Sequence, residues 1–397
     1  MPLKRVLWPI GGLALALAIW LQISGLQAGA RGEPAFFNDF TSTYAASQLL
    51  RQGDAGALYD RVRKGIADRA AAHAQYGLGV LTENQAAEVG SSPWYYPPTY
   101  SFVLVGLGQL PYWLAFFVWT FSGGLLFFLA LHRYLPISLA GALALAAPPT
   151  FYNLMMGQNG FFLAALLGFA LSSMPSRPWL AGFFLGLASI KPNLGILIPF
   201  ALIAGACWST FLSAAATSLL LALLSFLVHG SGAWLAFFYA LSDYISGASL
   251  HGVNLRQMAS AQGAALIAGV PMTIAGVLQK TITGATVLGV IALWWKIDKR
   301  PRVLDIRNAI LLLATPFALP SIYLYDLSIV TLAAAILLKD GLQNTVSRRE
   351  QWVWAGGFFS LALAFPLAKL SDWQLAPLAL AALLGLALTR YRKAITQ

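Results

Sequence analysis

Charged side chains are scarce in this sequence. Only 10% of its 397 residues are Asp, Glu, Lys or Arg, whereas 58% are hydrophobic, and the mean hydropathy is +0.70. Soluble domains carry about 25% charged residues, because a water-facing surface needs them. So few charges cannot cover a soluble core, which excludes soluble enzymes and nucleic-acid-binding proteins. The sequence predicts an all-α polytopic membrane protein.

Cysteine pairs and nucleotide or metal motifs are also missing. Cys207 is the sole cysteine, so no disulfide can form within the chain. The sequence contains no GxxxxGK[ST] phosphate loop, no HExxH, no CxxC and no GxSxG, which are typical of ATPases, zinc peptidases, metal sites and serine hydrolases. We therefore expect neither a metal nor a cofactor.

Long hydrophobic runs dominate what is present. A spanning helix needs roughly 17 to 25 residues, and fewer where proline or glycine interrupts it inside a protein. Twelve runs meet this loosely, and they predict a single transmembrane domain over residues 1–397. They lie near 7–26, 112–131, 137–150, 160–174, 179–190, 193–207, 211–229, 281–296, 306–319, 322–338, 352–368 and 374–391.

Basic residues decide whether a further short run, 99–110, crosses the membrane. Cytoplasmic loops carry the excess of Lys and Arg. With a cytoplasmic N-terminus and no crossing at 99–110, 15 of the 25 basic residues lie on the cytoplasmic side. A crossing there would invert the rule. We expect 12 spans, both termini in the cytoplasm, and a segment 99–110 that lies in or dips into the outer leaflet.

Two large segments, 27–94 and 230–280, then face the extracytoplasmic side of what we expect to be the cytoplasmic membrane. The first span also resembles a secretory signal, because Lys4-Arg5 precedes an apolar stretch. That stretch is longer than a typical signal core and many spans follow, which favours an uncleaved anchor.

The first outer segment predicts two amphipathic helices that lie on the membrane. One begins at Asp39, which is suited to cap it, and the other begins near Asp60. In the second helix Val62, Ile66 and Ala70 lie along one apolar side. Its other side carries Lys64 and further basic residues, which we expect to meet solvent or lipid phosphates.

A group of polar residues falls at the outer boundary under this topology. Polar groups at membrane depth are costly, so each is a candidate for function. A carboxylate can accept a proton from an attacking hydroxyl, and a lysine can hold a phosphate as a point charge. Such a set suits transfer of a group from a lipid phosphate to a hydroxyl. Its members are Asp39, Gln158, Asn159, Lys191, Tyr323, Tyr325 and Asp326.

Further substrate-binding candidates have simpler alternatives. Tyr95 and Tyr96 can stack on sugars, or they can anchor the chain at the membrane interface. His251 and Arg256 lie in the second outer segment, where a solvated loop histidine is the simpler interpretation. For Asp326 the simpler alternative is a hydrogen bond to neighbouring backbone or an ion pair with Lys191 within the fold, without a direct role in the site.

Five stretches in order resemble glycosyltransferase family 87, in the GT-C superfamily of integral membrane enzymes. They are FNDFTSTYAASQLLRQGDAGALYD (37–60), WYYPP (94–98), GQNGFFLAAL (157–166), AGFFLGLASIKPNLGILIP (181–199) and TPFALPSIYLYDL (315–327).

The resemblance implies an inverting transferase. Its donor is a polyprenyl-phosphate sugar, usually mannose, its acceptor a lipid or glycan, and it works outside the cytoplasmic membrane without metal or nucleotide. The resemblance also implies that Asp39 is the general base, that Lys191 belongs to the Lys-Pro block, and that Tyr325-Asp326 is the Tyr-Asp block. This chain has Thr-Pro-Phe at 315–317, where the family has Ser-Pro with a nearby histidine, so no histidine role carries over.

Two other classes of function remain open. A transporter or flippase of a lipid-linked saccharide would show repeated halves and ionisable residues near the midplane. The sequence shows no clear internal repeat, and its polar residues lie at the outer boundary. A structural subunit would have no activity and would tolerate changes at Asp39.

Overall fold

The computed structural model describes residues 2–30, 39–76, 94–245, 255–295, 298 and 300–396. Within these ranges the chain is helical and forms no strand apart from one isolated bridge. Its helices are α1 (Pro2–Ala30), α2 (Phe40–Arg51), α3 (Arg61–Tyr76), α5 (Ser101–Leu104), α6 (Tyr112–His132), α7 (Ile137–Ala146), α8 (Pro148–Met156), α9 (Gly160–Ser173), α10 (Pro178–Leu187), α11 (Ile198–Ala204), α12 (Trp208–Ile245), α13 (Ala261–Ile267), α14 (Met272–Trp295), α15 (Pro301–Ala318), α16 (Ser328–Gln343), α17 (Arg348–Phe359), α18 (Ala364–Ser371) and α19 (Ala376–Thr396).

Four helical stretches among the described residues are long and apolar enough to cross a membrane. They are α6, most of α12, α14 and the stretch Arg348–Ser371, and α7 with α8 makes a fifth if that pair, bent by 63°, counts as one span. The expectation of a helical membrane protein is therefore confirmed. The 12 spans and the cytoplasmic termini remain predictions.

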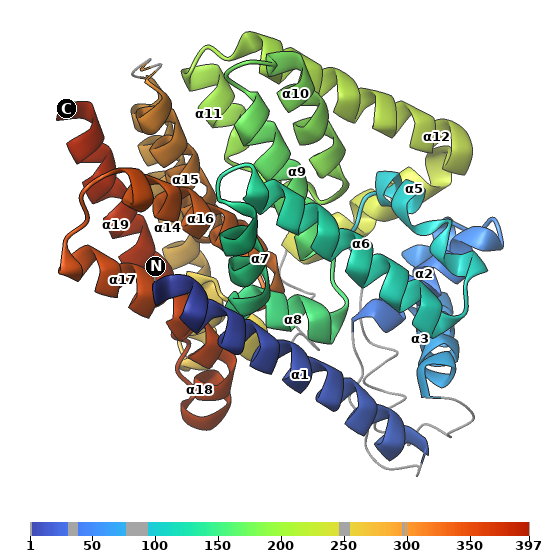
Figure 1. Ribbon diagram of the computed structural model, residues 1–397. Coiled ribbons are helices and arrows are strands. Elements are labelled where there is room, and N and C mark those ends of the chain that lie inside the picture. The colour runs from blue at the N-terminus through green and yellow to red at the C-terminus, as the bar shows by residue number, and fades with distance from the viewer. Residues whose placement is uncertain are drawn as a thin grey trace.

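Helix α16 forms the centre of the molecule and packs against α15 and α9 (Figure 1). Its residues Ser328 to Leu337 are all buried, as expected for a helix that is apolar on every side. By contrast, α12 and α14 leave large side chains such as Leu219 and Leu288 exposed. Their outward faces are apolar enough to meet lipid.

The first outer segment folds onto one end of α6, where α2, α3 and α5 gather (Figure 1). Helices form at both predicted places, and the Asp60 carboxylate accepts the backbone N–H groups of Val62 and Arg63 at the start of α3. The segment 99–110 forms short turns of 3₁₀ and α-helix rather than one long helix.

The prediction that Lys64 of α3 meets solvent or lipid phosphates is wrong. Val62 and Ile66 are 71% and 57% exposed, whereas Lys64 and Asp68 are both 1% exposed. Lys64 Nζ lies 2.5 Å from Asp68 Oδ1 and donates to Ser42 Oγ at 2.7 Å. The inward face of α3 is polar because this ion pair and the α2 hydroxyl satisfy each other's charges and hydrogen bonds.

Candidate active site

Asp39 lies directly before α2, and its carboxylate points away from that helix. It accepts no capping hydrogen bond from the backbone of α2, so the interpretation of Asp39 as a helix cap is wrong. Instead, Gln158 Nε2 donates to Asp39 Oδ2 at 2.8 Å. Phe40 fixes the start of α2 because its ring packs edge-on against Tyr112 and Phe116 of α6.

A tight turn between α8 and α9 brings Gln158 to this carboxylate. Gly157 has φ +62°, in the left-handed region, and a Cβ there would lie 2.6 Å from Phe40 Cβ. Only glycine allows both the backbone angle and this close approach. Asn159, two residues after Gly157, is buried and donates through Nδ2 to the Tyr100 hydroxyl at 3.1 Å.

Lys191 enters the same site from the break between two 3₁₀ turns, η4 (Ala188–Ile190) and η5 (Pro192–Gly195). Its Nζ lies 2.5 Å from Asp326 Oδ1 and 3.3 Å from Asn159 Oδ1. The rings of Tyr96 and Tyr325 lie 5.7 and 5.3 Å from Nζ, close enough for cation–π attraction.

Asp326 belongs to η8 (Leu324–Leu327), the turn that leads into α16. Besides Lys191, it accepts the Tyr323 backbone N–H at 3.3 Å. The ion-pair partnership considered from the sequence is therefore present. Asn153 of α8 holds the turn in place by donating to the Tyr325 carbonyl at 2.6 Å.

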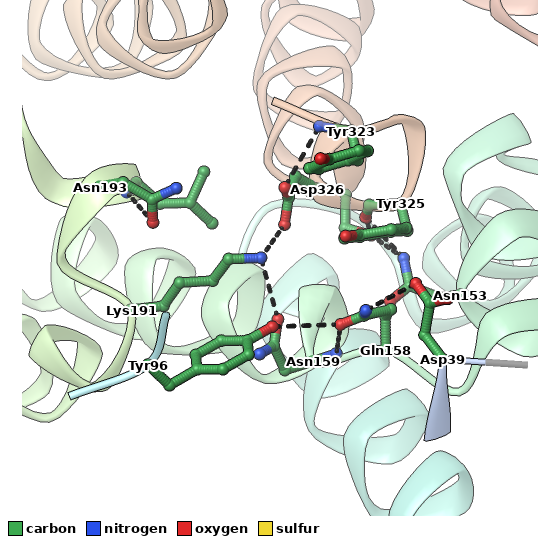
Figure 2. A network of polar contacts seen from close by, with 12 residues as sticks. Asp39, Tyr96, Asn153, Gln158, Asn159, Lys191, Asn193, Tyr323, Tyr325 and Asp326 are labelled. Atoms are coloured by element: carbon green, nitrogen blue, oxygen red, sulfur yellow. Dashed lines mark hydrogen bonds and ion pairs between the residues drawn. The ribbon is translucent and has the colours of Figure 1, made fainter. Parts of the chain in front are cut away.

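These groups form one continuous polar network (Figure 2). The Tyr96 hydroxyl donates to Gln158 Oε1 at 3.4 Å, which joins the Asp39 end of the network to the aromatic side of Lys191. Six elements of the chain supply its residues: the start of α2, the segment 94–98, the α8–α9 turn, the η4–η5 break, η8 and α8. The network thus contains Asp39, which is hydrogen-bonded to the Gln158 amide, and Lys191, which is ion-paired with Asp326.

The sequence model of glycosyltransferase family 87 matches residues 94–321, more than half of the chain. The chain belongs to glycosyltransferase family 87. No curated protein and no solved structure matches it. The matched range includes Gln158, Asn159 and Lys191, whereas Asp39 and Asp326 lie outside it.

Family membership makes this chain a membrane glycosyltransferase and gives the polar network a context. A carboxylate within reach of a substrate hydroxyl can accept its proton. Among the described residues Asp39 forms no ion pair. Although the side chain keeps some exposure, burial raises the pKa of Asp39 above its usual 3.8. The Gln158 hydrogen bond and the Lys191 charge oppose this rise in pKa, and the Asp326 charge adds to it.

Tyr95 and Arg256 lie outside the polar network of this glycosyltransferase. Tyr95 lines a pocket between α3 and the end of α12. Arg256 donates to Asp372 Oδ1 at 2.7 Å and to the Ala368 carbonyl at 3.0 Å, which ties it to α18. His251 lies outside the described residues. No group of three His, Cys, Asp or Glu able to hold a metal occurs in the described part of the chain.

Two residues of the network were missed in the sequence. Asn153 and Tyr100 both contact the predicted residues. Asn153 lies in an apolar stretch, so the cost of a polar group at that depth could have marked it. Tyr100 carried no such signal, because buried tyrosines are common in apolar surroundings.

Proposed function

We propose that this membrane glycosyltransferase transfers a sugar, mannose, from a polyprenyl-phosphate donor to a hydroxyl of a lipid or glycan acceptor. The reaction occurs on the extracytoplasmic face of the cytoplasmic membrane, inverts the anomeric configuration and uses no metal or nucleotide. The observation that carries the proposal is the single network joining Asp39, through Gln158 and Tyr96, to Lys191.

In the proposed step Asp39 is the general base. Its carboxylate accepts the proton of the acceptor hydroxyl while that oxygen bonds to the anomeric carbon of the donor sugar. The bond from the anomeric carbon to the phosphate oxygen breaks on the opposite face. The electron pair leaves with the polyprenyl phosphate, whose charge Lys191 offsets as a point charge. A single displacement of this kind inverts the configuration.

Asp39 suits this role better than Asp326 does. Asp326 is 1% exposed, and each of its carboxylate oxygens already has a partner, the Lys191 ammonium on Oδ1 and the Tyr323 backbone N–H on Oδ2. Asp39 has an amide partner and no cation within bonding distance among the described residues. Its raised pKa also makes it a stronger base for the proton of the acceptor hydroxyl.

The aromatic residues complete the proposed donor site. The Tyr323 and Tyr325 rings stack 5.3 Å apart, and Tyr325 with Tyr96 flanks the Lys191 ammonium. Ring faces can contact the C–H side of a sugar, and the ammonium between them faces the charge of the leaving phosphate. Asp326 then keeps Lys191 in position when no donor is bound.

The test compares Asp39→Asn with Asp54→Asn in purified protein reconstituted into vesicles. Asp54 lies in the same segment, is paired with Arg63 at the surface and is the matched control. The substrates are polyprenyl-phosphate [³H]mannose and a lipid and glycan extract of cell envelopes. We expect Asp39→Asn to lose about a hundredfold or more of the transfer rate, while Asp54→Asn keeps it.

Other results would overturn the proposal. Unchanged transfer in Asp39→Asn would remove the general base from the mechanism. Movement of labelled lipid across the vesicle membrane without a new glycosidic bond would identify a flippase instead. A wild type without transfer activity, together with normal folding of every Asp39 variant, would indicate a structural subunit.

A further inference from the structure

A second concave site lies beside the polar network, and we refer to it as the outer pocket. It has a volume of about 340 Å³, within the range of about 300–1,000 Å³ typical of small-molecule sites. The residues that carry the argument are Tyr59, Asp60, Lys64, Trp94, Tyr239 and Asp243. They come from the first outer segment and from the last turns of α12.

The outer pocket is joined to the network through residues 94–96. Trp94 lines the pocket, and its ring lies 4.8 Å from that of Tyr96, which contacts Gln158. Tyr59, on another wall, donates its hydroxyl to the Tyr96 carbonyl at 2.8 Å. The pocket and the network therefore share one wall.

A second connection reaches the start of α2. Lys64 lines the pocket and donates to Ser42, which lies one helical turn after Asp39. The same ammonium lies 5.3 Å from the centre of the Trp94 ring and is paired with Asp68. These contacts hold the floor of the pocket rigid, and a rigid site loses less entropy on binding.

The lining defines the chemistry of the occupant. Trp94 and Tyr239 offer aromatic faces, Asp60 and Asp243 offer carboxylate oxygens, and Arg61 and Lys64 contribute cationic groups. Two carboxylates and two cationic groups leave no excess of either charge for an ionic ligand, and this many charges disfavour a lipid tail. A neutral molecule with hydroxyl donors on its edge and C–H groups on its face fits both kinds of wall. Sugars have this pattern.

We propose that the outer pocket binds the terminal saccharide of a glycan acceptor and directs one of its hydroxyls toward Asp39. This inference rests on the proposed transferase function, and it assigns the acceptor to a class: a saccharide rather than a lipid without sugar. Tyr239 is 74% exposed at the rim, where it can close over a ring that has entered.

Direct binding tests the pocket without relying on catalysis. The probes are methyl α-mannopyranoside and methyl α-glucopyranoside, measured by saturation-transfer NMR on purified protein in detergent. We expect wild type and Asp39→Asn to bind at least one of them. Tyr239→Ala and Asp243→Asn should bind about tenfold more weakly, because each removes a contact worth about a factor of ten. Phe238→Ala, an exposed neighbour on α12 that does not line the pocket, should bind like wild type.

Kinetics separate this inference from the proposed function. In the transfer assay Tyr239→Ala and Asp243→Asn should raise the KM for the acceptor about tenfold and leave the KM for the donor unchanged. Absence of binding to both probes in wild type, or equal binding by the pocket variants, would overturn the inference. Saccharide binding lost only in the pocket variants, together with full transfer in Asp39→Asn, would support the pocket and reject the proposed base.

Discussion

Lys191 Nζ lies 2.5 Å from Asp326 Oδ1, although 135 residues separate them in the chain. Both residues are buried, at 8% and 1% exposure. The pair fixes the η4–η5 break against the turn that precedes α16. Because each charge has been removed from water, neither is stable without the other.

This pairing predicts an asymmetry between single and double substitutions. Lys191→Met and Asp326→Leu should each lower the free energy of unfolding by about 3–5 kcal/mol, since each leaves a buried charge alone. The double variant should recover much of that loss because no charge remains, yet it should have no transferase activity. Thermal unfolding in detergent measures the cycle.

The exposed ion pair between Arg300 and Asp298 provides the control. Removing Arg300 should have little effect on stability, because water already solvates both charges. A double variant at 191 and 326 whose loss equals the sum of the two single losses would show that the two charges do not depend on each other.

The Gln158 hydrogen bond predicts a shift in the pH dependence of transfer. The base must be ionised, so activity falls as pH falls through the pKa of Asp39, which burial has raised above 3.8. The Gln158 amide opposes that rise. Gln158→Leu removes it, so the acidic limb of kcat/KM should move to higher pH. The exposed Gln52→Leu at the end of α2 should leave the limb in place, and an unmoved limb in Gln158→Leu would exclude Asp39 as the titrating base.

The position of the network could largely be predicted from the sequence. Gln158, Asn159, Lys191 and Asp326 stood out because polar groups are rare in apolar runs, and the basic residues placed them on one side of the membrane. Their direct contacts confirm that they come together. The separations along the chain gave no distances, so the pairing of Lys191 with Asp326 was open until the fold was known.

The outer pocket and the facing of α3 could not be predicted in the same way. Periodicity placed Lys64 on the solvated side of α3, since it assumes that a buried face is apolar. The actual partner offers Ser42 and Trp94 to Lys64, which makes the charged face the buried one. Only tertiary contacts determine this choice. Likewise, the predicted run 211–229 ends at a kink at Gly230, where φ is +74°, and a further helical stretch of α12 reaches the wall of the pocket.

The proposed mechanism needs Asp39 ionised, and we expect this ionisation to lower the stability of the fold. Its pKa is higher in the folded protein than in the unfolded chain, so ionisation of Asp39 destabilises the fold as pH rises above 3.8. Asp39→Asn keeps an oxygen for Gln158 and removes the charge, so its midpoint of thermal unfolding at pH 7 should exceed that of wild type. The gain should shrink toward pH 4. Asp54→Asn, which loses its partnership with Arg63, should show no gain, and a less stable Asp39→Asn at pH 7 would indicate that the carboxylate stabilises the fold.

The network requires α9 to approach η8 closely at Gly160. A Cβ on Gly160 would lie 2.4 Å from the Tyr325 carbonyl oxygen and 2.8 Å from Asn153 Oδ1, closer than atoms can pack. Gly160→Ala should therefore push η8 away, misplace Asp326 relative to Lys191, and cost about 1–3 kcal/mol of stability together with most of the activity.

Gly124→Ala on α6, where a Cβ meets open space, should be neutral or slightly stabilising because alanine favours helix. Thermal unfolding and the transfer rate measure both variants, and wild-type behaviour of Gly160→Ala would show that the tight contact with η8 is not required.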